Sequence, residues 1–143
     1  MRIALLTNEY PPNIYGGAGV HAENLSRELA LAEGGANQVD VFCFGDQLDA
    51  SEGISVRGVN PGMRFGFENS GIEKIADVLT RDVAILGNLH RADIIHCHTW
   101  YTHFAGCLSK QFLGAPLVLT THSLEPHRPW KEEQLGQAYH ISR

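Results

Sequence analysis

The sequence lacks a long apolar run and an excess of basic charge, and we expect no signal peptide at its start. No stretch approaches the ~20 consecutive apolar residues that cross a bilayer, so a membrane-spanning protein is not expected. Lys and Arg total 11 against 16 Asp and Glu, and the net charge of −5 argues against nucleic acid as a partner, because nucleic-acid binders need a basic surface. The apolar run at residues 1–7 is too short for a signal peptide, so we expect a cytoplasmic protein.

Cysteine is scarce and histidine is abundant. Cys43, Cys97 and Cys107 stand far apart and form no CxxC pair. An odd number of widely spaced cysteines predicts neither a disulfide framework nor a thiolate metal site. Each has apolar or small neighbours, so we expect all three to be buried. Eight histidines, in contrast, lie among 143 residues, several of them next to predicted strands.

Short apolar segments alternate with segments of helical period along the whole chain, whose length fits one domain. Strands are predicted at residues 3–7, 39–44, 54–59, 92–98 and 117–121. Helices are predicted at residues 18–34, 72–90, 100–113 and 132–139. This alternation predicts an α/β fold, a doubly wound parallel sheet (Rossmann-like), with the predicted strands side by side in the order third, second, first, fourth, fifth.

The apolar period also predicts which helix faces are buried. In the first helix the stripe comprises Ala18, Ala22, Leu25, Leu29 and Ala32. In the second helix it comprises Ile72, Ile75, Ala76, Leu79, Val83 and Leu86. We expect both stripes to face the sheet, because a helix in such a fold buries its apolar side.

A glycine-rich segment follows the first predicted strand, where ligands of wound sheets bind. It comprises Gly16, Gly17, Ala18 and Gly19, at the start of a predicted helix. Free N–H groups at a helix start attract anions, and glycines let an anion come close to the backbone. We interpret the segment as an anion cradle, although it is neither a GxGxxG fingerprint nor a Walker loop. The alternative is a tight turn between the two preceding prolines and the helix.

A polar and aromatic group follows the fourth predicted strand. His96 and His98 are two residues apart and therefore share one face of that strand. A metal would need a third ligand from the same pole, such as His103 or His122, and the chain offers no clear carboxylate set, so we expect no metal site. Roles in packing, or in binding a sugar or phosphate, stay open for these histidines.

The residues after this histidine pair are further candidates. Thr99 suits an N-cap of the next helix. Trp100 and Tyr101 suit either stacking on a sugar ring or burial. Beyond the fifth predicted strand, His122 is the first polar residue and is expected to point into the crevice at the switch point. Ser123 beside it lacks a nucleophile-elbow pattern, so serine hydrolase chemistry is not indicated.

Three blocks of the sequence together resemble bacterial glycogen synthases and related retaining glycosyltransferases with the GT-B fold. The blocks are residues 8–21 (NEYPPNIYGGAGVH), 92–101 (ADIIHCHTWY) and 121–136 (THSLEPHRPWKEEQLG). The last block is similar to the actinobacterial-type branch. Ile14 stands where the plant and enterobacterial enzymes carry Lys, and Thr99 where they carry Asp, which favours that branch.

The resemblance implies transfer of glucose from a nucleotide donor, ADP-glucose, to the 4-OH of an α-glucan or of glucose 1-phosphate, with retention and without a cofactor. It implies that His122 is catalytic and lies beside the donor sugar. Residues 16–19 would contact the donor diphosphate or an acceptor phosphate, and residues 98–101 would line the acceptor side. Two other readings stay open: a flavodoxin-like sugar- or phosphate-binding module without catalysis, and a metal-dependent hydrolase using His96 and His98.

The resemblance also implies a domain arrangement. GT-B enzymes have two similar domains, so residues 1–143 would form an incomplete N-terminal, acceptor-side domain, with the C-terminal nucleotide-binding domain absent. We therefore expect no transferase activity from this chain alone. We also expect uncovered apolar surfaces on the fifth predicted strand and on the helices, with self-association as their consequence.

Overall fold

The computed structural model describes residues 1–143 except 64, 69, 124–126, 129, 137–138 and 141–143. The strands are β1 (Arg2–Thr7), β2 (Gln38–Phe44), β3 (Leu48–Ser51), β4 (Ile54–Val59), β5 (Ile94–His98) and β6 (Leu117–Thr120). The helices are α1 (Gly17–Gly35), α2 (Ser70–Asn88), the 3₁₀ turn η1 (Trp100–Thr102), α3 (His103–Leu113) and α4 (Lys131–Leu135). The part of the block 121–136 at residues 124–126 and 129 lies outside the described residues.

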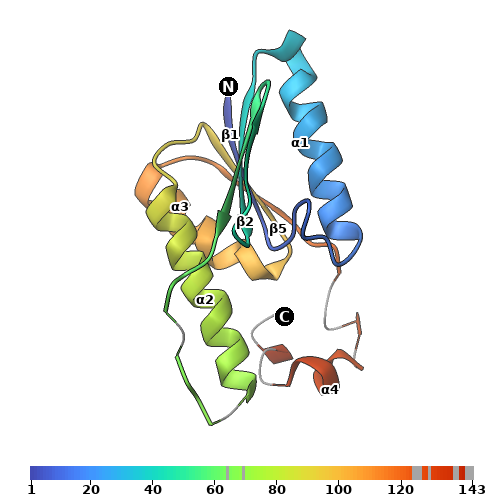
Figure 1. Ribbon diagram of the computed structural model, residues 1–143, viewed down its shortest axis with the longest axis vertical. Coiled ribbons are helices and arrows are strands. Elements are labelled where there is room, and N and C mark those ends of the chain that lie inside the picture. The colour runs from blue at the N-terminus through green and yellow to red at the C-terminus, as the bar shows by residue number, and fades with distance from the viewer. Residues whose placement is uncertain (64, 69, 124–126, 129, 137–138, 141–143) are drawn as a thin grey trace.

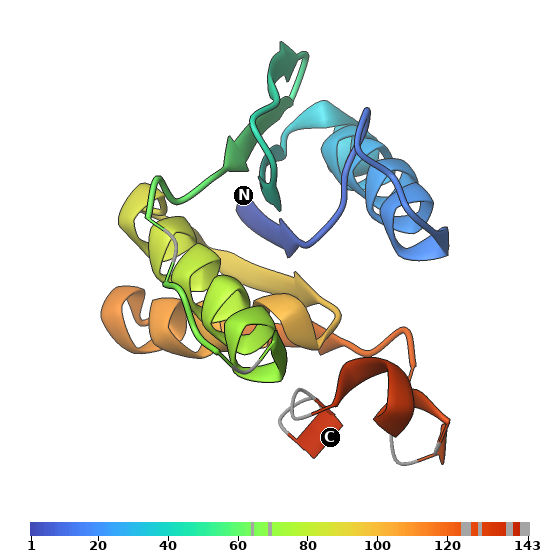
Figure 2. The ribbon, with the colours of Figure 1, turned by 60° about the horizontal axis from the view of Figure 1, so that its bottom comes forward.

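The strands form one six-stranded sheet in the order β3-β4-β2-β1-β5-β6. All neighbouring strands are parallel except β3, which pairs antiparallel with β4. The predicted doubly wound α/β fold and the predicted order of its strands are therefore confirmed. Figures 1 and 2 show α1 on one face of the sheet and α2 with α3 on the other.

The central strand β1 explains why its sequence is apolar throughout. Successive side chains of a strand point to opposite faces, and both faces here are covered by helices. Ile3 and Leu5 belong to the core on the α1 side, whereas Ala4 and Leu6 belong to the core that includes residues of α2 and α3. β1 thereby holds the two halves of the core together.

In α1 the buried face is shifted from the predicted stripe. The buried residues are Gly19, Ala22, Ser26 and Ala30. Leu25 and Leu29 pack at the border of the core, whereas Ala32 is exposed. Ser26 is buried because its hydroxyl lies 2.7 Å from that of Tyr10 and donates to the Glu23 carbonyl. The regular helix ends at Leu31, earlier than predicted, since Ala32 has ψ of 154° and Glu33 and Gly34 have φ of 53° and 71°.

In α2 the predicted stripe is wrong by about one position. The buried residues are Val78, Asp82 and Ile85 in α2 and Leu89 directly after it. Several members of the predicted stripe are exposed instead, namely Ile72, Leu79 and Val83. The cause is Asp82, which is only 1% exposed and which an apolar period excludes. Burial, partly offset by the backbone N–H of Ala105, raises the pKa of Asp82 to about 8.

The outer strand β6 is only half covered, as expected. Val118 and Leu119 are 40% and 46% exposed, and Phe112 at the end of α3 is 73% exposed. Cys43 and Cys97 are buried, but Cys107 is exposed on α3, which corrects the expectation for that residue. No helix in the described part of the chain is long and apolar enough to cross a membrane.

Candidate functional site

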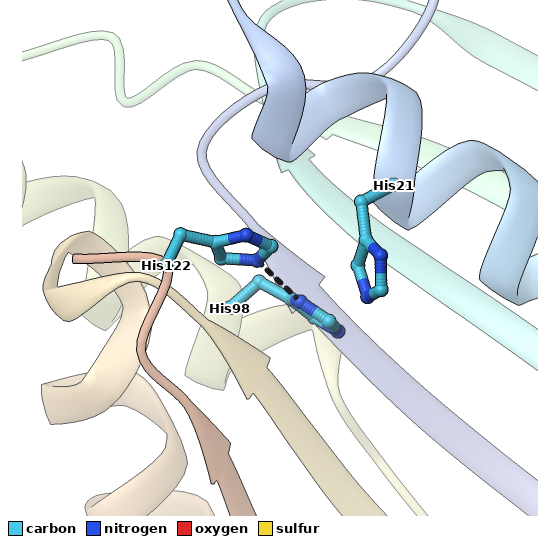
Figure 3. A group of neighbouring side chains, drawn as sticks. All are labelled: His21, His98 and His122. Carbon is cyan, nitrogen blue, oxygen red and sulfur yellow. Dashed lines mark hydrogen bonds between the residues drawn. The ribbon is translucent and has the colours of Figure 1, made fainter.

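The predicted site residues meet at the carboxyl ends of the central strands. His98 is the last residue of β5, His122 follows β6, and His21 lies in the first turns of α1 (Figure 3). The centroids of the His21 and His122 rings are 5.1 Å apart, so the start of α1 and the segment after β6 share one pole of the sheet. The glycine segment and His122 thus lie at the same end of the molecule.

The rings of His21, His98 and His122 form a compact group, which we call the three-histidine cluster. His98 Nδ1 and His122 Nε2 are 3.0 Å apart and share a hydrogen bond. The His21 ring lies 5.4 Å from that of His98. One ring nitrogen of each of the three residues lies within 4.8 Å of the others, so the cluster has the geometry of a candidate ligand set.

His96 has a packing and hydrogen-bonding role, one of the roles that the sequence left open. The centroid of its ring lies 4.3 Å from that of His98 and the two rings are tilted by 37°, a proximity expected for residues on one face of a strand. Its Nε2 forms a hydrogen bond with Thr120 Oγ1 at 2.7 Å. The ring nitrogens that lie close enough together to bind one metal ion belong to His21, His98 and His122 and not to His96, among the residues that the structure describes. His21 was not predicted as a site residue. It lies near His98 and His122 only because α1 begins beside the ends of β5 and β6, and the linear sequence does not contain this arrangement.

Burial favours the neutral form of His98 and His122. It lowers the pKa of His98 to about 3, with further lowering from the neighbouring imidazoles of His96, His122 and His21. It also lowers the pKa of His122, where Glu9 opposes the shift. Neutral rings that face each other nitrogen to nitrogen require one donor and one acceptor, so His98 fixes the orientation of the exposed His122 ring.

The glycine segment is partly occupied by an anion of the chain itself. Glu9 is only 7% exposed, and its Oε2 accepts hydrogen bonds from the backbone N–H groups of Tyr15 and Gly16 at 2.7 and 2.8 Å. Glu9 escaped the sequence-based search, although an acidic residue between a buried strand and a glycine-rich helix start is a signal for such a contact.

The glycines of the segment have different roles. A Cβ on Gly19 would lie 3.1 Å from Glu9 Cγ and 3.2 Å from Ile14 Cγ1, so Gly19 permits close packing of α1 on the preceding loop. A Cβ on Gly17 would meet nothing within 4 Å. Gly16 is the N-cap of α1 and no side chain caps the helix, while Ala18 is half-buried. The open part of the predicted cradle is therefore at Gly17.

Thr99 occupies the N-cap of η1, but its hydroxyl does not cap the turn, which corrects that expectation. The hydroxyl instead donates to Asn8 Oδ1 at 2.9 Å, and the backbone N–H donates to the Thr120 carbonyl at 3.0 Å. These contacts hold Thr99 at φ 65° and ψ 160°, a conformation that is costly for a β-branched residue. Such strain is concentrated at functional sites.

Trp100 and Tyr101 stack on each other directly after β5. Their ring centroids are 4.2 Å apart with an interplanar angle of 28°, and both residues are half-buried. One face of each ring is thus occupied by the other ring, so at most one face of each is left for a ligand.

Comparison with known proteins decides the family. The family model of Glycosyltransferase Family 4 matches residues 15–142. The chain belongs to this glycosyltransferase family. The family match covers the helix start at Gly17 and all three members of the three-histidine cluster.

Named relatives of this family 4 chain include synthases of sugar phosphates and glucans. It is 43% identical to the alpha-maltose-1-phosphate synthase of Mycolicibacterium smegmatis, over 99% of this chain and 33% of that protein. It is 29% identical to a glycogen synthase of Mycobacterium tuberculosis, over 98% of this chain and 38% of that protein. The chain therefore spans about a third of the length of these curated relatives.

Solved structures agree on the fold. A sucrose-phosphate synthase from Thermosynechococcus elongatus matches 96% of this family 4 chain and 38% of its own, with a TM-score of 0.68 and 17% identity. At that identity the likeness supports the Rossmann-like architecture alone.

Proposed function

We propose that this chain forms the acceptor-side part of a retaining hexosyltransferase with the GT-B fold. The reaction moves glucose from a nucleotide-glucose donor, ADP-glucose, to the 4-OH of glucose 1-phosphate or of an α-glucan. One observation carries the proposal: the open helix start at Gly17 and the His98–His122 pair lie at the same pole of a wound sheet. The 43% identity to an alpha-maltose-1-phosphate synthase favours glucose 1-phosphate as the acceptor.

His122 is the proposed catalytic residue. Its ring is exposed at the pole and is held by the fully buried His98, which acts as a positioning residue. In this role the neutral His122 imidazole hydrogen-bonds a hydroxyl of the donor glucose and fixes the sugar next to the attacking oxygen. Because the imidazole of His122 is already held in place, it does not need to reorient during the reaction.

The start of α1 is the proposed phosphate site. The positive end of a helix stabilises charge that develops on a departing diphosphate or is carried by an acceptor phosphate. Gly17 offers the open approach, with Gly16, Ala18 and Gly19 forming the surrounding turn. We assign Thr99, Trp100 and Tyr101 to the acceptor side, because they follow β5 at this pole.

The proposed reaction needs a second domain that binds the nucleotide. The relatives are about three times as long as this chain, which matches 33% of the M. smegmatis protein. We therefore propose that residues 1–143 are inactive alone. We also propose a cytoplasmic location, consistent with three free cysteines.

A chimera tests the transferase directly. Residues 1–143 would replace the matching third of the M. smegmatis alpha-maltose-1-phosphate synthase, and products from ADP-glucose and glucose 1-phosphate would be identified by NMR. Formation of an α-linked disaccharide phosphate, abolished in the H122A chimera, is expected. A folded chimera with unchanged turnover after H122A would contradict the proposed role of His122.

A binding experiment on the chain itself separates the transferase from a binding module. In ¹⁵N NMR spectra, glucose 1-phosphate should shift the amide signals of Gly17 and Ala18 weakly, at millimolar ligand. Tight binding of ADP or maltose by the chain alone would favour the flavodoxin-like module instead, and glucosyl transfer by it alone would contradict its proposed inactivity.

The uncovered strand β6 supports a further proposal, that two copies of this chain associate. Val118 and Leu119 expose apolar surface on a strand whose outer edge pairs with no strand among the described residues. Such edges pair with other chains.

A further inference from the structure

The three-histidine cluster has a property that the proposed sugar transfer does not require. Its members come from three separate segments, α1, β5 and the chain after β6, and converge without any carboxylate among them (Figure 3). We propose that His21, His98 and His122 bind a divalent transition-metal ion, with Zn²⁺ as the preferred ion.

The spacing fits such an ion after a small adjustment. Tetrahedral zinc holds imidazole nitrogens at ~2.0–2.1 Å, which places them about 3.4 Å from one another. His98 Nδ1 and His122 Nε2 are already 3.0 Å apart. The third nitrogen lies within 4.8 Å of the others, and its owner His21 is exposed on α1, so a change of side-chain torsion can bring it closer.

An ion would replace the hydrogen bond that joins two members of the cluster. Two neutral ring nitrogens that face each other at 3.0 Å share one proton, and the ion would take the place of that proton between His98 Nδ1 and His122 Nε2. The ion would then hold the His122 ring in the position that the hydrogen bond gives it in the proposed function. The other nitrogen of His98, Nε2, is buried, and no hydrogen-bond partner for it exists among the described residues. With Nδ1 bound to the ion, Nε2 would carry the ring proton, which calls for a water as its acceptor.

The donor set also selects the class of ion. Imidazole suits zinc, copper, nickel and cobalt, whereas magnesium and calcium prefer oxygen ligands. Three protein nitrogens leave the fourth tetrahedral position to water or to an oxygen of a bound molecule. The cluster therefore differs from the pair of His96 and His98 that the sequence offered, since His96 Nε2 is engaged by Thr120.

Metal titration of the purified chain tests the site. Zn²⁺ would be titrated in competition with a chromophoric chelator, and Co²⁺ would be followed by its visible absorption. We expect one ion per chain and the intense cobalt bands of a tetrahedral site. H21A and H122A should each weaken binding at least about tenfold, because even outer-shell partners of metal sites are worth ~10–100-fold in affinity.

H90A is the matched control. His90 is exposed and lines a pocket with Arg2, the first residue of β1. This is the end of the sheet opposite the three-histidine cluster, so H90A should leave zinc affinity unchanged. Since His21 and His122 are also exposed, both variants should melt within a few degrees of the parent chain. Equal zinc affinity of H21A and the parent, or octahedral cobalt spectra, would overturn the site. These outcomes are independent of glucosyl transfer, so they stand apart from the test of the proposed function.

Discussion

The carboxylate of Glu9 accepts a hydrogen bond from the backbone N–H of Gly16 at 2.8 Å, directly before the first turn of α1. The same oxygen accepts the N–H of Tyr15 at 2.7 Å. The chain thus supplies a negative charge at the positive end of its own helix, where a carboxylate is stabilising. The proposed phosphate site is therefore confined to the open side of the helix start, at Gly17.

Removing this carboxylate should destabilise the fold. E9A loses two charge-assisted hydrogen bonds from a buried position, so the free energy of unfolding should fall by roughly 2–4 kcal/mol. Urea denaturation followed by circular dichroism measures the change. E28A, which removes an exposed carboxylate from α1, should stay within about 0.5 kcal/mol of the parent. Equal stability of E9A and E28A would show that the contact contributes nothing.

Gly17 and Gly19 should respond oppositely to alanine. G19A forces a Cβ to 3.1 Å from Glu9, so stability should fall by about 1–3 kcal/mol. G17A places its Cβ in open space, so stability should hold, while the methyl group obstructs a phosphate at the helix start. Thermal melts and NMR titration with glucose 1-phosphate separate the two effects. Undiminished amide shifts in G17A would place the phosphate elsewhere.

The fold was largely predictable because its central strands β1, β2 and β5 are mostly buried on both faces and its turns carry glycine and proline. Strand β3 was missed since all four of its residues are exposed and it pairs antiparallel at the edge. The α2 face was misassigned because Asp82 replaces an apolar residue in the buried stripe. Periodicity measures polarity, whereas a buried carboxyl depends on neighbours that only the tertiary structure supplies.

The site was predictable in part because the strand order places the glycine segment, His98 and His122 at one pole. The contacts of Glu9 and the position of His21 depend on how the loop after β1 folds back and on the angle of α1, and a linear pattern contains neither. The expected cap by Thr99 does not form because its hydroxyl, whose oxygen would accept a backbone N–H in a cap, is directed to Asn8 and donates to Asn8 Oδ1.

Buried His98 should make the fold sensitive to acid. Burial lowers its pKa from 6.5 to about 3, so between these values the unfolded chain binds a proton that the folded chain does not. Its contribution is complete above about pH 6.5 and declines as the pH falls toward 3, by on the order of 4 kcal/mol. Denaturation curves from pH 7 to 4 measure the slope, which H98Q should reduce. An unchanged slope in a folded H98Q chain would contradict the assignment.

Buried Asp82 should act in the opposite direction. Its pKa is raised from 3.8 to about 8, so the folded chain retains a proton that the unfolded chain loses, and stability declines as the pH rises from about 4 to 8. The amide side chain in D82N cannot ionise, so the free energy of unfolding of this variant should not show the decline. Relative to the parent, D82N should become more stable by on the order of 4 kcal/mol as the pH rises over that interval. D49N, at an exposed position of β3, is the control and should follow the parent curve.

The proposed self-association should depend on the apolar edge of the sheet. Sedimentation velocity should show association that increases with protein concentration, and L119K should shift it toward monomer because a charge at an exposed edge opposes pairing. L48K makes the same change on β3, at the other edge, where Leu48 is 76% exposed. If L48K disrupts the dimer and L119K does not, the contact lies at the β3 edge, which would contradict the proposal.

Asn8 and Glu9 are consecutive in the chain, yet their side chains form hydrogen bonds with different parts of the molecule. Asn8 accepts the hydroxyl of Thr99 at the end of β5, and Glu9 accepts the N–H of Gly16 at the start of α1. These two hydrogen bonds set the position of the start of α1 relative to the end of β5, and both depend on the backbone geometry of one dipeptide. A substitution that changes the backbone at residues 8–9 would therefore disturb both sides of the pole at once.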